Sequence, residues 1–311
     1  MIHTVTLNPA LDKVLFLKEQ GLVLNCTNRA KRMLDTIGGK GTHVSLNLCQ
    51  LGVDNCAFGL AYGANGREIM RALRQEGVDV RFVYNERANS RVNTLLIEEN
   101  GNCTTVAEPG VVPTEQEFND LLTAMKESIK PGDSLVLSGD ASNCPPDVYV
   151  RILQELADKQ LHIYLDASGP SLLQCLPSSP FFIKPNEDEL SQICGRPLQS
   201  ERDIIESVCK ISEEYDIQII AVTLGHNGSV VKMGGDIYRV KPPQVQVRNT
   251  IGCGDCFLSG MIYGSAKNLS PEESLRFATA ASAANAESDL SFGFDEVRAG
   301  ELLSLCKVEK I

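Results

Sequence analysis

The sequence lacks any apolar run close to the roughly 20 residues that a membrane-spanning helix needs, so we expect no integral membrane protein. We also expect no secretory signal, because the first residues, MIHTVTLNPALDK, contain no basic segment followed by a long apolar stretch. Internal repeats and low-complexity tracts are absent as well. With 43% hydrophobic and 22% charged residues, we expect a cytoplasmic globular protein with no membrane partner.

Positive charge is scarce too. Lys and Arg number 29 against 40 Asp and Glu, a net charge of -11, which argues against nucleic acid as a partner. A local basic cluster could still hold a small phosphorylated molecule. The 11 cysteines are scattered singly apart from Cys253-Gly-Asp-Cys256, and this pattern predicts neither a disulfide framework nor a four-cysteine zinc site.

Short β-rich runs alternate with helical patterns along most of the 311 residues. The expected strands are residues 2–7, 134–137, 161–165, 181–183 and 217–222. Apolar positions recur at three- and four-residue spacing in the expected helices, which are residues 42–51, 67–75, 115–129, 147–159, 201–214, 255–267 and 270–287. This alternation predicts an α/β fold with a mostly parallel sheet covered on both faces.

Two stretches, about residues 13–36 and 88–107, interrupt the alternation. They are polar, favour β-structure and contain a hairpin signal at Glu99-Asn-Gly-Asn102. We expect them to form a small second sheet inserted into a single domain of residues 1–311, as a lid over one edge of the main sheet. The alternative is a pair of ordinary surface hairpins.

Two glycine-rich turns, Thr250-Ile-Gly-Cys-Gly-Asp255 and Ile37-Gly-Gly-Lys-Gly41, precede expected helices. Glycines allow close backbone approach, and the free first amides of a helix bind anions. Each turn also has a plain structural interpretation, with Asp255 as a helix N-cap and the second turn as an exposed loop. The second turn is not a Walker A loop, because Leu34 stands where that motif requires glycine and Gly41 follows the lysine.

Two further clusters adjoin expected strands. In Lys184-Pro-Asn-Glu-Asp-Glu189, Asn186 and Glu189 lie three residues apart, so on a helix they share a face that could order hydrated Mg²⁺. An ordinary acidic helix start is the alternative. Val222-Thr-Leu-Gly-His-Asn-Gly-Ser229 predicts a strand, a glycine turn and a second strand, and such a turn could receive a nucleotide phosphate or simply close a hairpin.

Taken in order, these clusters resemble one known family. Together with Asn8-Pro-Ala-Leu-Asp12 and Ser90-Arg-Val-Asn93, they are similar to the phosphofructokinase-B branch of the ribokinase-like sugar kinases. The NPALD opening looks most like the 1-phosphofructokinases and tagatose-6-phosphate kinases of that branch. The resemblance implies a three-layer α/β/α sandwich with a small β-sheet lid, and a homodimer paired through the lid. It implies ATP- and Mg²⁺-dependent phosphorylation of a ketohexose monophosphate, fructose 1-phosphate or tagatose 6-phosphate, to the bisphosphate.

The resemblance also implies roles for individual residues. Asp255 would be the general base, and the amides of Gly252, Cys253 and Gly254 would stabilise the transferring phosphoryl group. Asn186 and Glu189 would hold Mg²⁺ through water. The sugar phosphate would be bound by Asp12, Gly38, Gly39, Lys40, His43, Arg91, Asn93, Ser138 and Gly139. ATP would be bound by Lys184, Asn186, Thr223, Gly225, His226, Asn227, Gly228, Asn249, Gly254 and Asn285, the last near an adenine beside the alanine-rich helix 270–287.

Some positions depart from the family pattern. His43 stands where the family commonly has an Asn that helps to hold the sugar, and Asp140 places negative charge near the expected sugar phosphate. These departures leave open an unphosphorylated sugar or a nucleoside as the acceptor. A non-catalytic sugar-phosphate sensor is a further alternative, although the presence of Asp255 argues against it. Cys253 and Cys256 occupy the first helical turn, where a lowered thiol pKa would make the enzyme sensitive to oxidants and protected by ATP.

Overall fold

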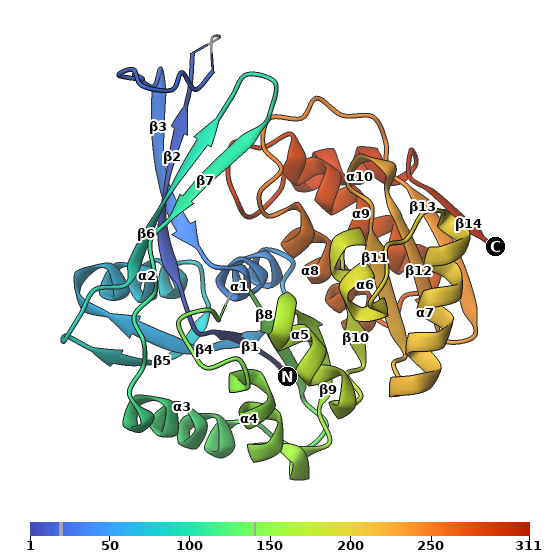
Figure 1. Cartoon of the computed structure of the whole chain (residues 1–311), viewed down its shortest axis with the longest axis horizontal. Helices are drawn as coiled ribbons and strands as arrows, with labels where there is room; N and C mark the ends of the chain where they lie inside the picture. Colours follow the sequence, from blue (N-terminus) through green and yellow to red (C-terminus); the bar gives the residue numbers. More distant parts are fainter. Residues whose placement is uncertain (19–20, 140) are drawn as a thin grey trace.

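The computed structural model describes residues 1–18, 21–139 and 141–311, which form a large sheet, a small sheet and flanking helices (Figure 1). The strands of the large sheet are β1 (Ile2–Thr6), β4 (Asn55–Tyr62), β5 (Asp79–Asn85), β8 (Ser134–Ser138), β9 (His162–Asp166), β10 (Phe182–Ile183), β11 (Ile219–Thr223), β12 (Ser229–Met233), β13 (Asp236–Lys241) and β14 (Lys307–Lys310). They lie in the order β14-β13-β12-β11-β10-β9-β8-β1-β4-β5. Pairing is parallel from β11 to β5 and antiparallel from β11 to β14.

Helices cover both faces of this sheet. One face carries α3 (Glu115–Ser128), α4 (Val148–Glu155), α5 (Gly169–Cys175), α6 (Glu187–Cys194) and α7 (Glu201–Tyr215). The other carries α1 (Lys40–Gln50), α2 (Gly63–Gln75), α8 (Cys253–Ala266) and α9 (Pro271–Ala286), with α10 (Glu296–Leu303) packed on α9. Along β8, Leu135 and Leu137 enter one core and Val136 the other. The three-layer α/β/α prediction is confirmed. No helix in the described ranges is long and apolar enough to span a bilayer.

The alanine-rich helix α9 packs closely against α8 on the second face. A Cβ at Gly260 of α8 would overlap the backbone of Ala278, so glycine is what allows the two axes to approach. Ala278, Ala280 and Ala281 are fully buried. The small side chains of α9 therefore serve helix packing in this fold.

The small sheet consists of β2 (Ala10–Phe16), β3 (Arg32–Gly38), β6 (Arg91–Ile97) and β7 (Cys103–Ala107), in the order β3-β2-β6-β7. Figure 1 shows it standing away from the large sheet, at the upper left. Val14, Phe16, Leu95 and Ile97 form a buried cluster on one of its faces. Its strands fall in the two stretches that interrupted the α/β alternation, extended to Ala10 and Gly38, and the predicted hairpin joins β6 to β7.

The sequence interpretation missed β4 and β5, which continue the sheet beyond β1, and also β13 and β14, which form its other end. All eight residues of β4 are buried, so the strand shows no alternation of apolar and polar side chains. The predicted helix over 147–159 is shorter than expected, because α4 ends at Glu155 and a separate 3₁₀ turn covers Ala157–Lys159.

A buried carboxylate anchors the segment that leads from β5 into the small sheet. Arg87 donates two hydrogen bonds to Glu117 of α3, at 2.8 and 2.7 Å, and the Tyr62 hydroxyl donates a third at 3.1 Å. The same carboxylate accepts from the backbone N–H of Thr114 and so completes the capping box of α3. The Arg87 hydrogen bonds lower the pKa of Glu117 to about 2.

We expect Glu117→Gln to lower the free energy of unfolding by about 1–3 kcal/mol at neutral pH, because it leaves Arg87 without its partner charge. The depressed pKa means that the wild type gains this stability above pH 4.5 and loses it as the pH falls toward about 2, so the difference between the two proteins should shrink over that range. Urea unfolding at several pH values measures it. Glu115→Gln is the control, since that side chain is 72% exposed and pairs with Arg151 on the surface. Equal losses of unfolding free energy in both variants would contradict the assignment of this stability to the buried Glu117 carboxylate.

Candidate active site

A cavity of about 400 Å³ lies between the two sheets, at the carboxyl ends of β1, β8, β9 and β10. Ligands of parallel α/β sheets bind at this end of the strands. The cavity is lined by many of the residues predicted from the sequence: Asp12, Gly39, Lys40, His43, Arg91, Asn93, Ser138, Gly139, Lys184, Gly252, Gly254 and Asp255. Gly38 is not part of the lining and pairs with Ala10 in the small sheet.

The sequence interpretation missed several lining residues: Thr6, Leu7, Asn8, Leu95, Thr105, Asp166, Thr250 and Ile251. The sequence did contain a signal for some of these residues, namely their position at the end of an expected strand. Asp166 follows the predicted strand 161–165 directly, and Thr6 and Asn8 lie at the end of the first strand. Polar residues at the carboxyl ends of neighbouring parallel strands meet at one edge of the sheet. Leu95 and Thr105 carried no such signal.

Asp255 lies in the first turn of α8, at the edge of the cavity. The helix begins at Cys253 after Gly252, which has φ 84°, and a Cβ at Gly252 would overlap the carbonyl oxygen of Ser291. Asp255 is therefore not the N-cap. No side chain of the described residues caps α8, whereas Ser270 caps α9, so the first amides of α8 are available to an anion.

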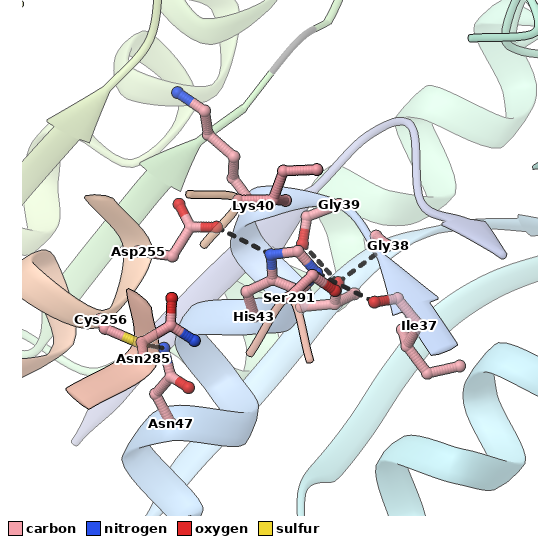
Figure 2. Close-up of polar contacts among 12 residues, drawn as sticks. Ile37, Gly38, Gly39, Lys40, His43, Asn47, Asp255, Cys256, Asn285 and Ser291 are labelled. Atoms are coloured by element: carbon pink, nitrogen blue, oxygen red, sulfur yellow. Dashed lines mark hydrogen bonds and ion pairs between the residues drawn. The ribbon is translucent and has the colours of Figure 1, made fainter. Parts of the chain in front are cut away.

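His43 of α1 contacts Asp255 directly (Figure 2). Its Nδ1 lies 2.8 Å from Asp255 Oδ2, and its Nε2 donates to the carbonyl oxygen of Ile37 at 2.9 Å, with the Ser291 hydroxyl 3.4 Å away. Burial alone would lower the pKa of His43, but the hydrogen bond and charge of Asp255 outweigh burial and raise it. The ring lines the cavity, but both of its nitrogens contact protein groups.

Asp166 lies at the centre of a cluster of charged side chains that line the cavity. Its Oδ1 lies 3.2 Å from Lys184 Nζ and 3.3 Å from Lys40 Nζ. Burial would raise the pKa of Asp166, but the charges of Lys184 and Lys40 outweigh it, so the net pKa is lowered. The charge of Asp166 in turn raises the pKa of Lys40. A Cβ at Gly254 would lie 3.2 Å from Lys184 Nζ, so this lysine lies beside the start of α8.

The small sheet contributes a second polar group. Asn93 Nδ2 donates to Asp12 Oδ1 at 2.8 Å, and Arg91 Nε donates to the carbonyl oxygen of Asn8 at 3.2 Å. Burial raises the pKa of Asp12, although the charge of His43 opposes this. Asp140, which the sequence placed near a sugar phosphate, lies outside the described residues.

Several buried polar atoms around the cavity have no hydrogen-bond partner within the described part of the chain. They are Thr6 Oγ1, Asn8 Nδ2, Asn93 Oδ1, Ser138 Oγ and Asp166 Oδ2. Buried polar groups are almost always paired in native proteins, so unpaired ones around a cavity fit a ligand with many hydroxyl or phosphate oxygens.

Asn186 and Glu189 form a capping box at the start of α6. Asn186 Oδ1 accepts from the Glu189 N–H at 2.8 Å, and the Asn186 N–H donates to Glu189 Oε2 at 2.9 Å. Among the described residues, no three His, Cys, Asp or Glu side chains gather as a metal site. The carboxylate retains one oxygen outside the cap, which suits a hydrated Mg²⁺ that keeps most of its own waters.

The remaining residues predicted to bind ATP separate into an exposed and a buried set. Gly225, His226 and Asn227 form an exposed 3₁₀ turn between β11 and β12, beside Asn186, which forms a β-bridge with Thr223. Asn249 and Asn285 are fully buried. Asn249 Oδ1 accepts from the Ile251 N–H, and Asn285 Nδ2 donates to the carbonyl oxygen of Gly293. In this structure the two asparagines shape the loops around Gly252 and are not exposed to the cavity.

Comparison with known proteins gives a consistent result. Residues 6–291 match the family model described as pfkB family carbohydrate kinase. The chain is 29% identical over 290 residues to 1-phosphofructokinase of Bacillus subtilis, covering 93% of each protein, and 29% identical over 283 residues to 1-phosphofructokinase of Vibrio cholerae, covering 91% of this chain and 88% of that relative. The structure of phosphofructokinase-2 from Escherichia coli in complex with substrates and products matches with a TM-score of 0.89 at 25% identity, covering 98% of both chains.

The pKa values of the Cys253 and Cys256 thiols differ from the lowering that the sequence led us to expect. Burial raises the pKa of Cys253 to about 12, and it raises the pKa of Cys256 well above its ordinary value. The negative charge of Asp255 acts in the same direction. The expected lowering from the first-turn position is therefore wrong, because desolvation of the thiolate exceeds the stabilisation that the helix terminus provides.

We expect iodoacetamide at about pH 8 to alkylate the exposed Cys26 at least roughly 100-fold faster than Cys253 or Cys256, because only the thiolate is reactive. Mass spectrometry of tryptic peptides over a time course measures the rates. A Cys26→Ser variant is the control, since its Cys253 peptide should stay unmodified over the same period. Comparable alkylation rates at Cys26 and Cys253 would instead show that the thiols beside the cavity are reactive.

Proposed function

We propose a specific reaction for this chain, which belongs to the pfkB family of carbohydrate kinases. The reaction transfers the γ-phosphoryl group of ATP to a hydroxyl of a ketohexose monophosphate, fructose 1-phosphate or tagatose 6-phosphate, and yields the bisphosphate. One observation carries the proposal: Asp255, the uncapped amides of α8 and the basic side chains of Lys40, Lys184 and Arg91 line the same cavity.

In this proposal Asp255 is the general base. The acceptor hydroxyl lies against its carboxylate, which takes the proton as the hydroxyl oxygen bonds to the γ-phosphorus and ADP leaves. The amides of Gly252, Cys253 and Gly254 face the charge that develops on the transferring group. Mg²⁺, when bound, neutralises phosphate charge, and Asn186 and Glu189 would orient it through water.

The substrate assignments follow the two sides of the cavity. Asp12 and Asn93, which already pair with each other, would bind sugar hydroxyls, and Arg91 with Lys40 would bind the existing phosphate. Two relatives along most of the chain are named 1-phosphofructokinase, which supports fructose 1-phosphate. The exposed turn Gly225–Asn227, with Thr223 and Gly228, would receive ATP.

We further propose that the small sheet is a lid that also pairs two subunits. Its face away from the buried cluster carries Leu15, Met33 and Leu96, which are cross-strand neighbours, and the exposed Val106. Leu15 and Leu96 are only partly buried, and Met33 is 59% exposed. Such a contiguous apolar surface is typical of a protein interface, and a second copy of the sheet would cover it.

We expect the purified protein with ATP and Mg²⁺ to release ADP with fructose 1-phosphate or tagatose 6-phosphate, and far more slowly with free sugars or nucleosides. A coupled ADP assay across such a panel measures kcat/KM for each acceptor. Asp255→Asn should lower kcat about 10²- to 10⁴-fold while ATP binding persists, because it removes the general base. Faster turnover of an unphosphorylated acceptor would favour the alternative kinase. Sugar-phosphate binding without any turnover would favour a sensor.

We expect the wild type to be a dimer and the double variant Met33→Asp, Val106→Asp to be a monomer, because buried charge would oppose pairing of the apolar faces. Sedimentation velocity over a range of protein concentrations distinguishes the two. Val297→Asp is the matched control, since Val297 is also exposed but lies on α10, far along the chain from the small sheet. An unchanged dimer in the double variant would place the interface elsewhere.

A further inference from the structure

The His43 ring lies between two oxygen atoms that accept hydrogen bonds. The carbonyl oxygen of Ile37 can only accept, so the Nε2 atom 2.9 Å away must carry a proton. An ionised Asp255 carboxylate can also only accept, so Nδ1, 2.8 Å from Oδ2, must carry a proton as well. With both nitrogens protonated, the ring is an imidazolium cation.

His3 provides a contrast within the same protein. It is also buried and also pairs with a carboxylate, since its Nε2 lies 2.8 Å from Asp133 Oδ2. Its Nδ1, however, is buried without a hydrogen-bond partner in the described part of the chain. Burial lowers the pKa of His3 despite Asp133. One bonded nitrogen leaves a buried histidine neutral here, whereas two bonded nitrogens favour the cation at His43.

The surroundings of His43 favour its positive charge. Asp255 faces the ring from α8 and Asp12 from β2, while the Ile37 carbonyl faces it from β3. The loop before α10 contributes the neutral groups Ser291 and Phe292, whose ring centre lies 6.0 Å away.

The charge balance of the cavity also depends on His43. Of the charged residues that line it, Lys40, Lys184 and Arg91 are balanced by Asp12, Asp166 and Asp255. An imidazolium therefore gives the cavity its net positive charge, which favours anionic phosphate substrates.

We propose that His43 is the positioning residue of Asp255 and acts as an imidazolium: it holds Oδ2 and leaves Oδ1 to accept the proton of the acceptor hydroxyl. This inference rests on the proposed kinase reaction. Without His43 the carboxylate could rotate and present either oxygen, which would lower the fraction of aligned complexes. His43 keeps both of its protons while the hydroxyl proton moves to Oδ1, the new bond to γ-phosphorus forms, and the bond to ADP breaks.

The proposal predicts an alkaline limb in the pH dependence of kcat. This limb follows loss of the second proton of His43. Because the folded-state pKa of His43 is raised, its paired form is complete at low pH and is lost as the pH rises through that pKa. Removing His43 should abolish the alkaline limb, because no second proton is then lost from this position.

We expect His43→Asn to lower kcat roughly 10- to 100-fold with little change in the KM for ATP, and to abolish the alkaline limb. Steady-state kinetics across a pH series measures both effects. His3→Asn is the control, because it removes a buried histidine that does not line the cavity and should leave the shape of the profile unchanged. An alkaline limb that persists in His43→Asn would overturn the proposal.

A second measurement does not depend on turnover. In protein labelled with ¹⁵N-histidine, the resonances that disappear in His43→Asn belong to His43. At about pH 7 both of its ring nitrogens should be protonated in the wild type, and Asp255→Asn should leave only one protonated. A neutral His43 in the folded wild type would overturn the proposal. If both nitrogens are protonated but no acceptor in the panel is phosphorylated, the proposed reaction fails while the imidazolium stands.

Discussion

The hydrogen bond between His43 and Asp255 joins two helices whose residues lie 212 positions apart in the sequence. It fixes the first turn of α1 against the first turn of α8, so that both helix starts face one cavity. Two other features of the site adjoin this junction: Lys40 lies in the same turn of α1, and the free amides of α8 lie in the turn that carries Asp255. The α/β framework supplies rigidity, but this contact sets where the Asp255 carboxylate lies.

The sequence predicted the layers of the fold and most of the cavity, because both depend on local patterns. Strand and helix periodicity indicated the sandwich, and glycine turns before helices located Asp255 and Lys40. What it could not predict depends on contacts between distant segments. The partner of His43 is one example, and the thiol pKa of Cys253 is another, because burial by surrounding elements outweighs a helix-start effect that is visible in the sequence. Strand β4 was missed since burial on both faces removes its alternation.

The site also shows how an acidic chain can suit anionic ligands. A net charge of -11 describes the whole surface, whereas the cavity concentrates three basic side chains against three carboxylates and one histidine. Asp166 holds the ammonium groups of Lys40 and Lys184 close together despite their mutual repulsion. It therefore lets two positive charges lie side by side at the point where phosphate groups would add negative charge.

The two sides of the cavity belong to different sheets. Asp12, Arg91 and Asn93 come from the small sheet, which stands apart from the large one, whereas Asp255 and the amides of α8 rest on the large sheet. A ligand that contacts both sides of the cavity therefore touches both sheets at once. A water molecule is too small to do so, and the distance between the two polar groups is thus a measure of ligand size built into the fold.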